Sequence, residues 1–302
     1  MQPSRCEPRA PPPMATGLAL FVRLAEVMNM KRCWQLLLAA AAVVAVGSAG
    51  AAAASETRGD GGRHGGYRGY FAIGCGFSHR NNDDPIIYPG RPGLSHNHTF
   101  FGNTATNASS TPTLLRGGTT TCRLAADTSA YWVPTLVLNG RAVTPLRATA
   151  YYIRRTRGTV QAFPAGLKII AGDAMATRAQ GARVTFWVCN GLASTSLASC
   201  PAGFRSEGLR FVVKFPNCWN GTALDSANHK SHLVYSTDGA CPASHPVALP
   251  ALAIVVRYPP LGSGPIALAS GGQFSGHADF VNAWDQATLE RLVDRYLNRS
   301  RR

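Results

Sequence analysis

Histidine and aspartate side chains recur at short spacing in polar segments of this 302-residue chain. His96 and His98 are two residues apart, so their imidazoles share one face if the segment is extended. His277 and Asp279 repeat this spacing with a carboxylate as the second group. Neutral imidazoles and carboxylates that converge from several segments can hold a divalent metal ion. Without a metal, the same groups can act as general acids and bases.

A third polar group contains Asp225, His229 and His232, which follow one another at i, i+4 and i+7. This spacing predicts that the three side chains share one face of a helical turn. We assign the catalytic roles to His229, His277, Asp279 and Asp225, and the metal-binding roles to His96, His98 and His232. The alternative is that each group only bonds its neighbouring backbone and holds a turn.

Aromatic residues form a second pattern. Trp219, Trp284 and Tyr131 could bind a substrate by stacking their flat rings on sugar rings, or could simply pack in the core. The chain has no dinucleotide-binding, phosphate-binding, zinc-protease or esterase motif. We therefore expect no nucleotide cofactor, and a divalent metal is the one cofactor that the residues suggest.

The N-terminal region has the order of a secretory signal. A basic head at Met30–Arg32 precedes an apolar run and an Ala-rich cleavage site at residues 52–54. We divide the chain into an upstream extension and signal peptide (1–54), a Gly/Arg-rich linker (55–69) and a single globular domain (70–302). A retained membrane anchor is the alternative to cleavage. The prediction is a secreted, extracellular monomer with no membrane attachment after cleavage.

Six of the eight cysteines follow the predicted cleavage site. An even number of cysteines in an exported chain is typical of disulfides. We predict that neighbours in the sequence pair: Cys75 with Cys122, Cys189 with Cys200, and Cys218 with Cys241.

The chain beyond residue 54 is strongly basic, with 25 lysines and arginines against 13 aspartates and glutamates. This balance favours an extracellular polysaccharide or another acidic polymer as partner. The arginines are scattered along the sequence, so biased codon usage is an equally good explanation. A nucleic-acid partner ranks last, because the export signal argues against it.

Short apolar runs bounded by turn residues predict the fold. They cover residues 131–138, 148–153, 167–171, 184–189, 209–215, 232–235 and 251–258. Two of them end in Asn-Gly, at residues 139–140 and 190–191, which is a strong hairpin signal. A helical pattern occurs only near the C-terminus, where Asp285 is the expected N-cap. We predict a mostly β protein: an antiparallel, jelly-roll-like sandwich with many loops and one C-terminal helix.

Motifs spread over most of this domain resemble a known family, the exported domain of unknown function numbered nineteen ninety-six, seen in actinobacteria and filamentous fungi. The most specific segment is FPNCWNG at residues 215–221, followed by LDS, His229 and His232. Other matching segments are 84–86 (DPI), 95–98 (SHNH), 127–134 (DTSAYWVP), 163–167 (FPAGL) and 276–280 (GHADF). Fungal relatives can carry a WSC sugar-binding module, so the resemblance implies a connection with cell walls or plant polymers. Asn228 stands where this family commonly has aspartate.

The leading hypothesis is a secreted protein that acts on or binds extracellular polysaccharide through a His/Asp-rich pocket. As an enzyme it would be a hydrolase or lyase that uses a metal ion or acid–base catalysis. The alternatives are a non-catalytic glycan- or wall-binding module and a buried polar network with a purely structural role.

Overall fold

The computed structural model describes residues 69–197, 200 and 208–299. The predicted extension, signal peptide and nearly all of the predicted linker lie outside these residues. The described part is mostly β, as the sequence predicted, and every named strand pair is antiparallel.

The first of two large sheets has six strands. In spatial order they are β1 (Tyr70–Cys75), β7 (Arg147–Ile153), β15 (Ala251–Tyr258), β11 (Leu209–Lys214), β9 (Thr185–Cys189) and β10 (Leu192–Ser194). Residues on these strands alternate between buried and more exposed positions, most clearly in β1 and β7. This period of two shows that one face of the sheet packs on the core and the other faces outward.

The second large sheet has five strands. Their order is β2 (Phe77–Asn81), β3 (His98–Gly102), β4 (Ala130–Pro134), β17 (His277–Val281) and β8 (Lys168–Gly172). All residues of β3, β4 and β17 are buried, so both faces of these central strands are covered.

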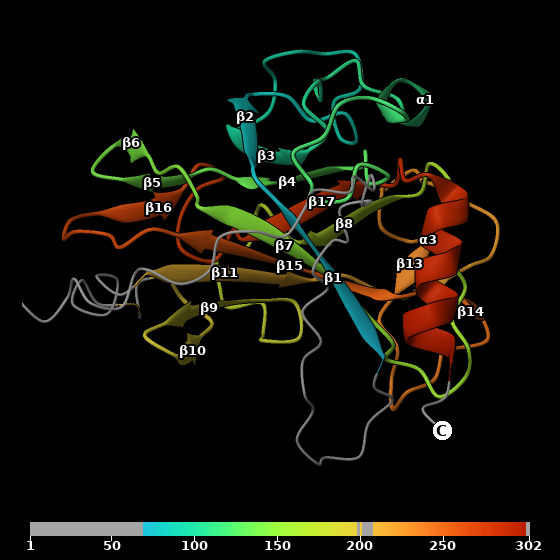
Figure 1. The fold of residues 1–302 in the computed structure, drawn as a ribbon. Helices are drawn as coiled ribbons and strands as arrows, with labels where there is room; N and C mark the ends of the chain where they lie inside the picture. Colours follow the sequence, from blue (N-terminus) through green and yellow to red (C-terminus); the bar gives the residue numbers. More distant parts are fainter. Residues whose placement is uncertain (1–68, 198–199, 201–207, 300–302) are drawn as a thin grey trace, which may run out of the picture. The chain divides into compact units, whose positions relative to one another are not determined.

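One hydrophobic core joins the two sheets. Phe71 on β1 and Phe211 on β11 belong to the same buried cluster as Tyr131 on β4 and Phe280 on β17. The sheets therefore pack face to face as a sandwich, and Figure 1 shows β7, β15 and β11 as one layer beside β4, β17 and β8.

The opposite face of the five-stranded sheet has its own smaller core. Phe100, Trp132 and Val281 meet Ile86 there, in a cluster separate from the main one. The two segments that flank β3, residues 82–97 and 103–129, lie over this face, and the second includes the short helix α1 (Pro112–Leu115) (Figure 1). Side chains on this outer face of the second sheet are therefore shielded from bulk water.

Two small sheets and a helix complete the fold. The strands of the small sheets are β13 (Leu233–Val234), β12 (Cys218–Trp219) and β14 (Val247–Ala248) in one, and β16 (Ile266–Leu268), β5 (Leu136–Leu138) and β6 (Arg141–Ala142) in the other. The helix α3 (Gln286–Val293) continues as a π-helical turn, η1 (Asp294–Asn298). As predicted, Asp285 caps α3, because its carboxylate accepts a hydrogen bond from the Thr288 backbone N–H.

Both predicted hairpins are present. Asn139 and Gly140 connect β5 to β6, and Asn190 and Gly191 connect β9 to β10, all four with positive φ. Two successive residues with positive φ are the requirement of a type I′ turn, which explains the Asn-Gly sequence at both places.

The three predicted disulfides are confirmed: Cys75–Cys122, Cys189–Cys200 and Cys218–Cys241. Such bonds are typical of proteins that mature outside the reducing cytosol. Within the described residues, no helix combines the length and apolar character needed to cross a membrane.

Candidate metal centre

The strand pairing of the second sheet brings the distant histidine segments together. His98 on β3 pairs with Pro134 on β4, while Asp279 on β17 pairs with Trp132, two residues earlier on the same central strand. Side chains at alternate positions of β17 share a face, so His277 and Asp279 both lie on the outer face with Val281. His96 precedes β3 by two residues and reaches the same place.

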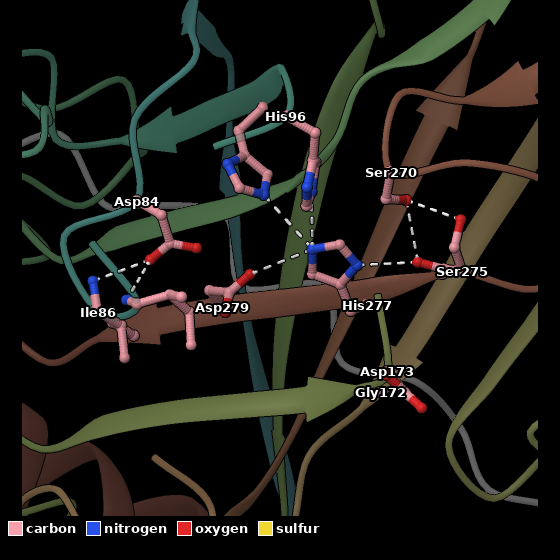
Figure 2. A network of polar contacts seen from close by, with 12 residues as sticks. Asp84, Ile86, His96, Gly172, Asp173, Ser270, Ser275, His277 and Asp279 are labelled. Atoms are coloured by element: carbon pink, nitrogen blue, oxygen red, sulfur yellow. Dashed lines mark hydrogen bonds and ion pairs between the residues drawn. The ribbon is translucent and has the colours of Figure 1, made fainter. Parts of the chain in front are cut away.

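Three imidazoles converge at this point. His277 Nε2 lies 3.1 Å from His96 Nε2 and 3.4 Å from His98 Nε2. Figure 2 shows His277 between His96 and Asp279, with Ser275 beyond its other ring nitrogen. His98 and His277 are buried, whereas His96 is only partly buried, so the cluster has one side nearer to solvent. The structure therefore brings segments 95–98 and 276–279 together, as a shared His/Asp-rich pocket requires.

Backbone carbonyls fix the tautomers of the two buried imidazoles. His98 Nδ1 lies 3.0 Å from the Asp83 carbonyl oxygen, and His277 Nδ1 lies 2.9 Å from that of Ser275. A carbonyl can only accept, so each Nδ1 donates and each neutral ring keeps its lone pair on Nε2. Burial lowers the pKa of His98 well below its usual value and that of His277 to about 3. Two lone pairs therefore face each other, an arrangement that a shared cation would stabilise.

Asp279 places a buried carboxyl oxygen without a hydrogen-bond partner beside the histidines. Its carboxyl group is 1% exposed, and its Oδ2 is buried without a hydrogen-bond partner among the described residues. That atom lies 3.9 Å from His277 Nε2. Burial, reinforced by the nearby Asp84 carboxyl, raises the pKa of Asp279 well above its usual value. Buried polar atoms are normally paired, so an unpaired carboxyl oxygen beside three imidazoles is a candidate cation ligand.

Asp84 is a further candidate ligand that sequence analysis missed. One of its oxygens, Oδ1, accepts hydrogen bonds of 2.9 Å from the backbone N–H groups of Ile86 and Ile87. Asp84, His98 and Asp279 each offer a ligand atom within 4.8 Å of the other two, and so do His96, His98 and His277. The two sets share His98. The available signal was the family-like DPI segment, to which we had assigned no role.

The two overlapping sets together offer three imidazole nitrogens and two carboxyl oxygens. Zn²⁺ and other first-row transition metals use such mixed nitrogen and oxygen ligands, whereas Ca²⁺ and Mg²⁺ prefer oxygen alone. The carbonyls that fix His98 and His277 are the outer hydrogen-bond partners that metal-bound histidines usually have. The side chains therefore fit a transition-metal ion.

The loop between β12 and β13 contains Asp225, His229 and His232, and it runs along β8, the edge strand of the five-stranded sheet. The Lys168 N–H donates to the Leu224 carbonyl, and Lys230 Nζ donates to the Gly172 carbonyl, so the loop follows β8 from one end to the other. Gly172 pairs with His277 on β17, so the Lys230 end of the loop lies beside the strand that carries His277 and Asp279. The loop thus borders the histidine cluster.

Asp225 and His229 form a dyad on this loop. His229 Nδ1 lies 2.9 Å from Asp225 Oδ1, and the other carboxylate oxygen lies 3.3 Å from Lys168 Nζ. No described residue bonds His229 Nε2. This arrangement orients the imidazole and leaves one nitrogen available to accept a proton.

The predicted helical turn is wrong, and so is the metal role of His232. Residues 225–232 form irregular turns, with His229 at a positive φ of 56°. Both ring nitrogens of His232 are occupied, by Ser226 Oγ at 3.0 Å and by the Lys168 carbonyl at 2.8 Å. His232 ties the loop to β8, and the ligand role that we assigned to it fits His277 instead. Asn228 also holds the loop, by accepting from the N–H groups of Lys230 and Ser231.

Two of the three predicted substrate-binding aromatics are core residues. Tyr131 and Trp284 are each 1% exposed and contact Tyr152, the first through its hydroxyl and the second through its indole N–H. Neither can offer an open face to a sugar ring, so this prediction is corrected. Trp219 is half-buried against the core, and its indole N–H donates to the Ala223 carbonyl.

Another cluster of ligand-type side chains is not a metal site. Cys75, Cys122 and Asp127 lie close together. Both cysteines are in a disulfide, so they have no thiolate to offer.

The fold and site together define a disulfide-bonded antiparallel β-sandwich with a His/Asp cluster on the outer face of one sheet. Residues 84–284 match the family model described as a domain of unknown function, DUF1996, and the chain belongs to this family. The match includes every side chain of the candidate centre. No curated protein and no solved structure gives a significant match.

Proposed function

We propose that this chain is a secreted metal-dependent hydrolase or lyase that acts on extracellular polysaccharide. In this proposal His96, His98, His277 and Asp279 hold a divalent transition-metal ion, and Asp84 adds a second carboxylate. The observation that carries it is the unpartnered Oδ2 of Asp279 beside three converging Nε2 atoms.

The dyad would supply the acid–base chemistry beside this ion. A bound divalent metal makes water acidic enough to serve as a nucleophile near neutral pH. In hydrolysis, His229 Nε2 would take the proton of the attacking water and pass it to the leaving oxygen as the bond to the substrate breaks. Asp225 keeps the ring oriented and stabilises its charged form.

The exposure of His96 indicates how a polymer would approach. It is the least buried of the three imidazoles, while His98 and His277 lie beneath the segment that covers the sheet. The His96 side of the cluster would therefore be the side that substrate reaches, and access of this kind separates catalytic from structural metal sites. The disulfides support an extracellular polymer as the substrate class.

Metal analysis of the purified protein tests the proposal. After removal of metals with a chelator, the wild-type chain should bind about one Zn²⁺ or Mn²⁺ ion per chain in a calorimetric titration. His96→Ala should weaken binding by about tenfold or more because it removes a ligand. His229→Gln should bind the ion normally but lose the release of reducing ends from a polysaccharide panel.

Two results would contradict the proposal. If neither ion binds the wild-type chain, the His/Asp cluster is a structural network. If the ion binds but no polymer in the panel is cleaved while wild type and His96→Ala retain polymer equally, the protein is a non-catalytic glycan-binding module.

A further inference from the structure

Three arginines from three neighbouring strands form a row on the six-stranded sheet. Arg210 on β11 pairs with Arg257 on β15, which in turn pairs with Arg147 on β7. Neighbouring strands are about 4.8 Å apart, so the three Cα atoms span only about 10 Å. All three side chains are exposed, and the residues beside them in each strand are buried. The row therefore lies on the face that points away from the core and from the metal centre.

Nothing in the described structure neutralises this arginine row. The six strands of the sheet contain no aspartate or glutamate. Among the described acidic side chains, none forms an ion pair with Arg147, Arg210 or Arg257. Like charges directly opposite each other on adjacent strands destabilise a sheet. The row thus has an unfavourable self-energy that an external anion would relieve.

The surroundings of the row suit an extended ligand. A cavity of about 300 Å³ adjoins Arg210 and Arg257 and is also lined by Val188 and Gly191. Farther along the same face, Lys214 lies over the Phe186 ring, and the Tyr70 and Tyr151 rings are 6.3 Å apart. Cationic groups and partly exposed rings therefore share one surface.

We propose that the arginine row binds a carboxylate-bearing polysaccharide and docks the protein on it. Guanidinium groups recognise carboxylates through paired, charge-assisted hydrogen bonds. Three guanidinium groups in line match an anion that recurs along a chain, and the disulfides place the protein where acidic polymers are mainly glycans. The inference rests on the polymer part of the proposed function and is independent of the metal.

The test is binding of soluble polygalacturonate, followed by calorimetry at low and high salt. Wild-type protein should bind, and the affinity should fall with added salt because the contacts are ionic. The triple variant Arg147→Gln, Arg210→Gln, Arg257→Gln should bind about tenfold more weakly or worse, since charged hydrogen bonds are lost. The matched control changes three exposed arginines elsewhere, Arg116→Gln, Arg141→Gln and Arg299→Gln, and should stay near the wild-type affinity.

The outcomes separate this inference from the proposed function. Equal weakening in both triple variants would show a general charge effect and overturn the inference. Tighter binding of duplex DNA through the same three arginines would also overturn it, in favour of a nucleic-acid surface. The triple variant Arg147→Gln, Arg210→Gln, Arg257→Gln should bind Zn²⁺ like wild type, because the row lies on the other large sheet. A failure of metal binding would therefore leave the polygalacturonate result unaffected. A failure of polygalacturonate binding would likewise leave the metal result unaffected.

Discussion

At the scale of single residues, the candidate centre depends on which ring nitrogen carries the proton. The Asp83 and Ser275 carbonyls hold protons on the Nδ1 atoms of His98 and His277 and so turn both lone pairs toward each other. The unpaired Oδ2 of Asp279 adds a buried carboxyl oxygen beside these two nitrogens. An apolar core at this position would have none of these features.

The reassignment of His232 gives a prediction at the same scale. His232→Ala leaves the Lys168 carbonyl and the Ser226 hydroxyl without their partner, so the free energy of unfolding should fall by about 1–3 kcal/mol. Metal affinity should not change, because His232 is outside the ligand cluster. Urea unfolding and calorimetric titration of Zn²⁺ measure the two quantities. Loss of the ion in this variant would restore the role that the sequence had indicated.

Sequence patterns identified several site residues but not their arrangement. The spacing of His96 with His98, and of His277 with Asp279, correctly indicated shared faces, because an extended segment repeats every two residues. The spacing of Asp225, His229 and His232 led to a wrong prediction. It matches one face of a helix, but the structure has irregular turns there. Asp84 was missed because a lone aspartate before proline is common in turns.

At the scale of elements, the two strands that matter most for the site were not predicted. Long apolar runs revealed β7, β11 and β15. By contrast, β3 and β17 begin with histidine and belong to a sheet that is covered on both faces. Such strands do not alternate between apolar and polar residues, and here ligand side chains replace part of the apolar run. Only long-range pairing with β4 defines them.

The contact between β8 and β17 gives a prediction for these elements. Gly172 has a positive φ of 86°, and a Cβ there would lie 2.5 Å from the Gly276 carbonyl oxygen and 2.9 Å from His277 Cα. Gly172→Ala should therefore displace the start of β17 and weaken Zn²⁺ binding by about tenfold. It should also reduce the free energy of unfolding by about 1–3 kcal/mol.

Gly102→Ala is the matched control for this change. Gly102 also has positive φ, and an added Cβ would clash with the Ser129 carbonyl at the far end of β3. The variant should lose similar stability but retain metal affinity after correction for the folded fraction. Equal loss of affinity in both variants would mean that the ion responds only to global stability.

At the scale of the whole molecule, a buried hydrogen-bond chain crosses the sandwich. Asp127 accepts from the Tyr131 hydroxyl, which contacts the Tyr152 hydroxyl, and Trp284 donates to Tyr152. Burial raises the pKa of Asp127 from 3.8 to about 7. The folded state therefore holds this proton more tightly than the unfolded chain does. The resulting stabilisation is complete below about pH 4 and is lost as pH rises through 7.

Asp127→Asn should remove this pH dependence. Relative to the variant, the wild-type free energy of unfolding should fall by about 4 kcal/mol between about pH 4 and pH 8. Urea unfolding of the metal-free protein at several pH values measures the difference. Asp238→Asn is the control, at an exposed turn position with positive φ that asparagine tolerates. Its free energy of unfolding should change with pH as that of the wild type does. If the free energies of unfolding of Asp127→Asn and wild type change with pH in the same way, the Asp127 carboxyl is ionised in the folded state.

The sequence distance between the histidines has a consequence for how the protein matures. His98 and His277 meet only after β3, β4 and β17 have aligned, although 179 positions separate the two residues in the chain. A nascent or incompletely folded polypeptide does not yet have these histidines side by side. Under the proposed function, the identity of the ion would therefore be decided late, by the metals available in the compartment where the last of these strands pairs.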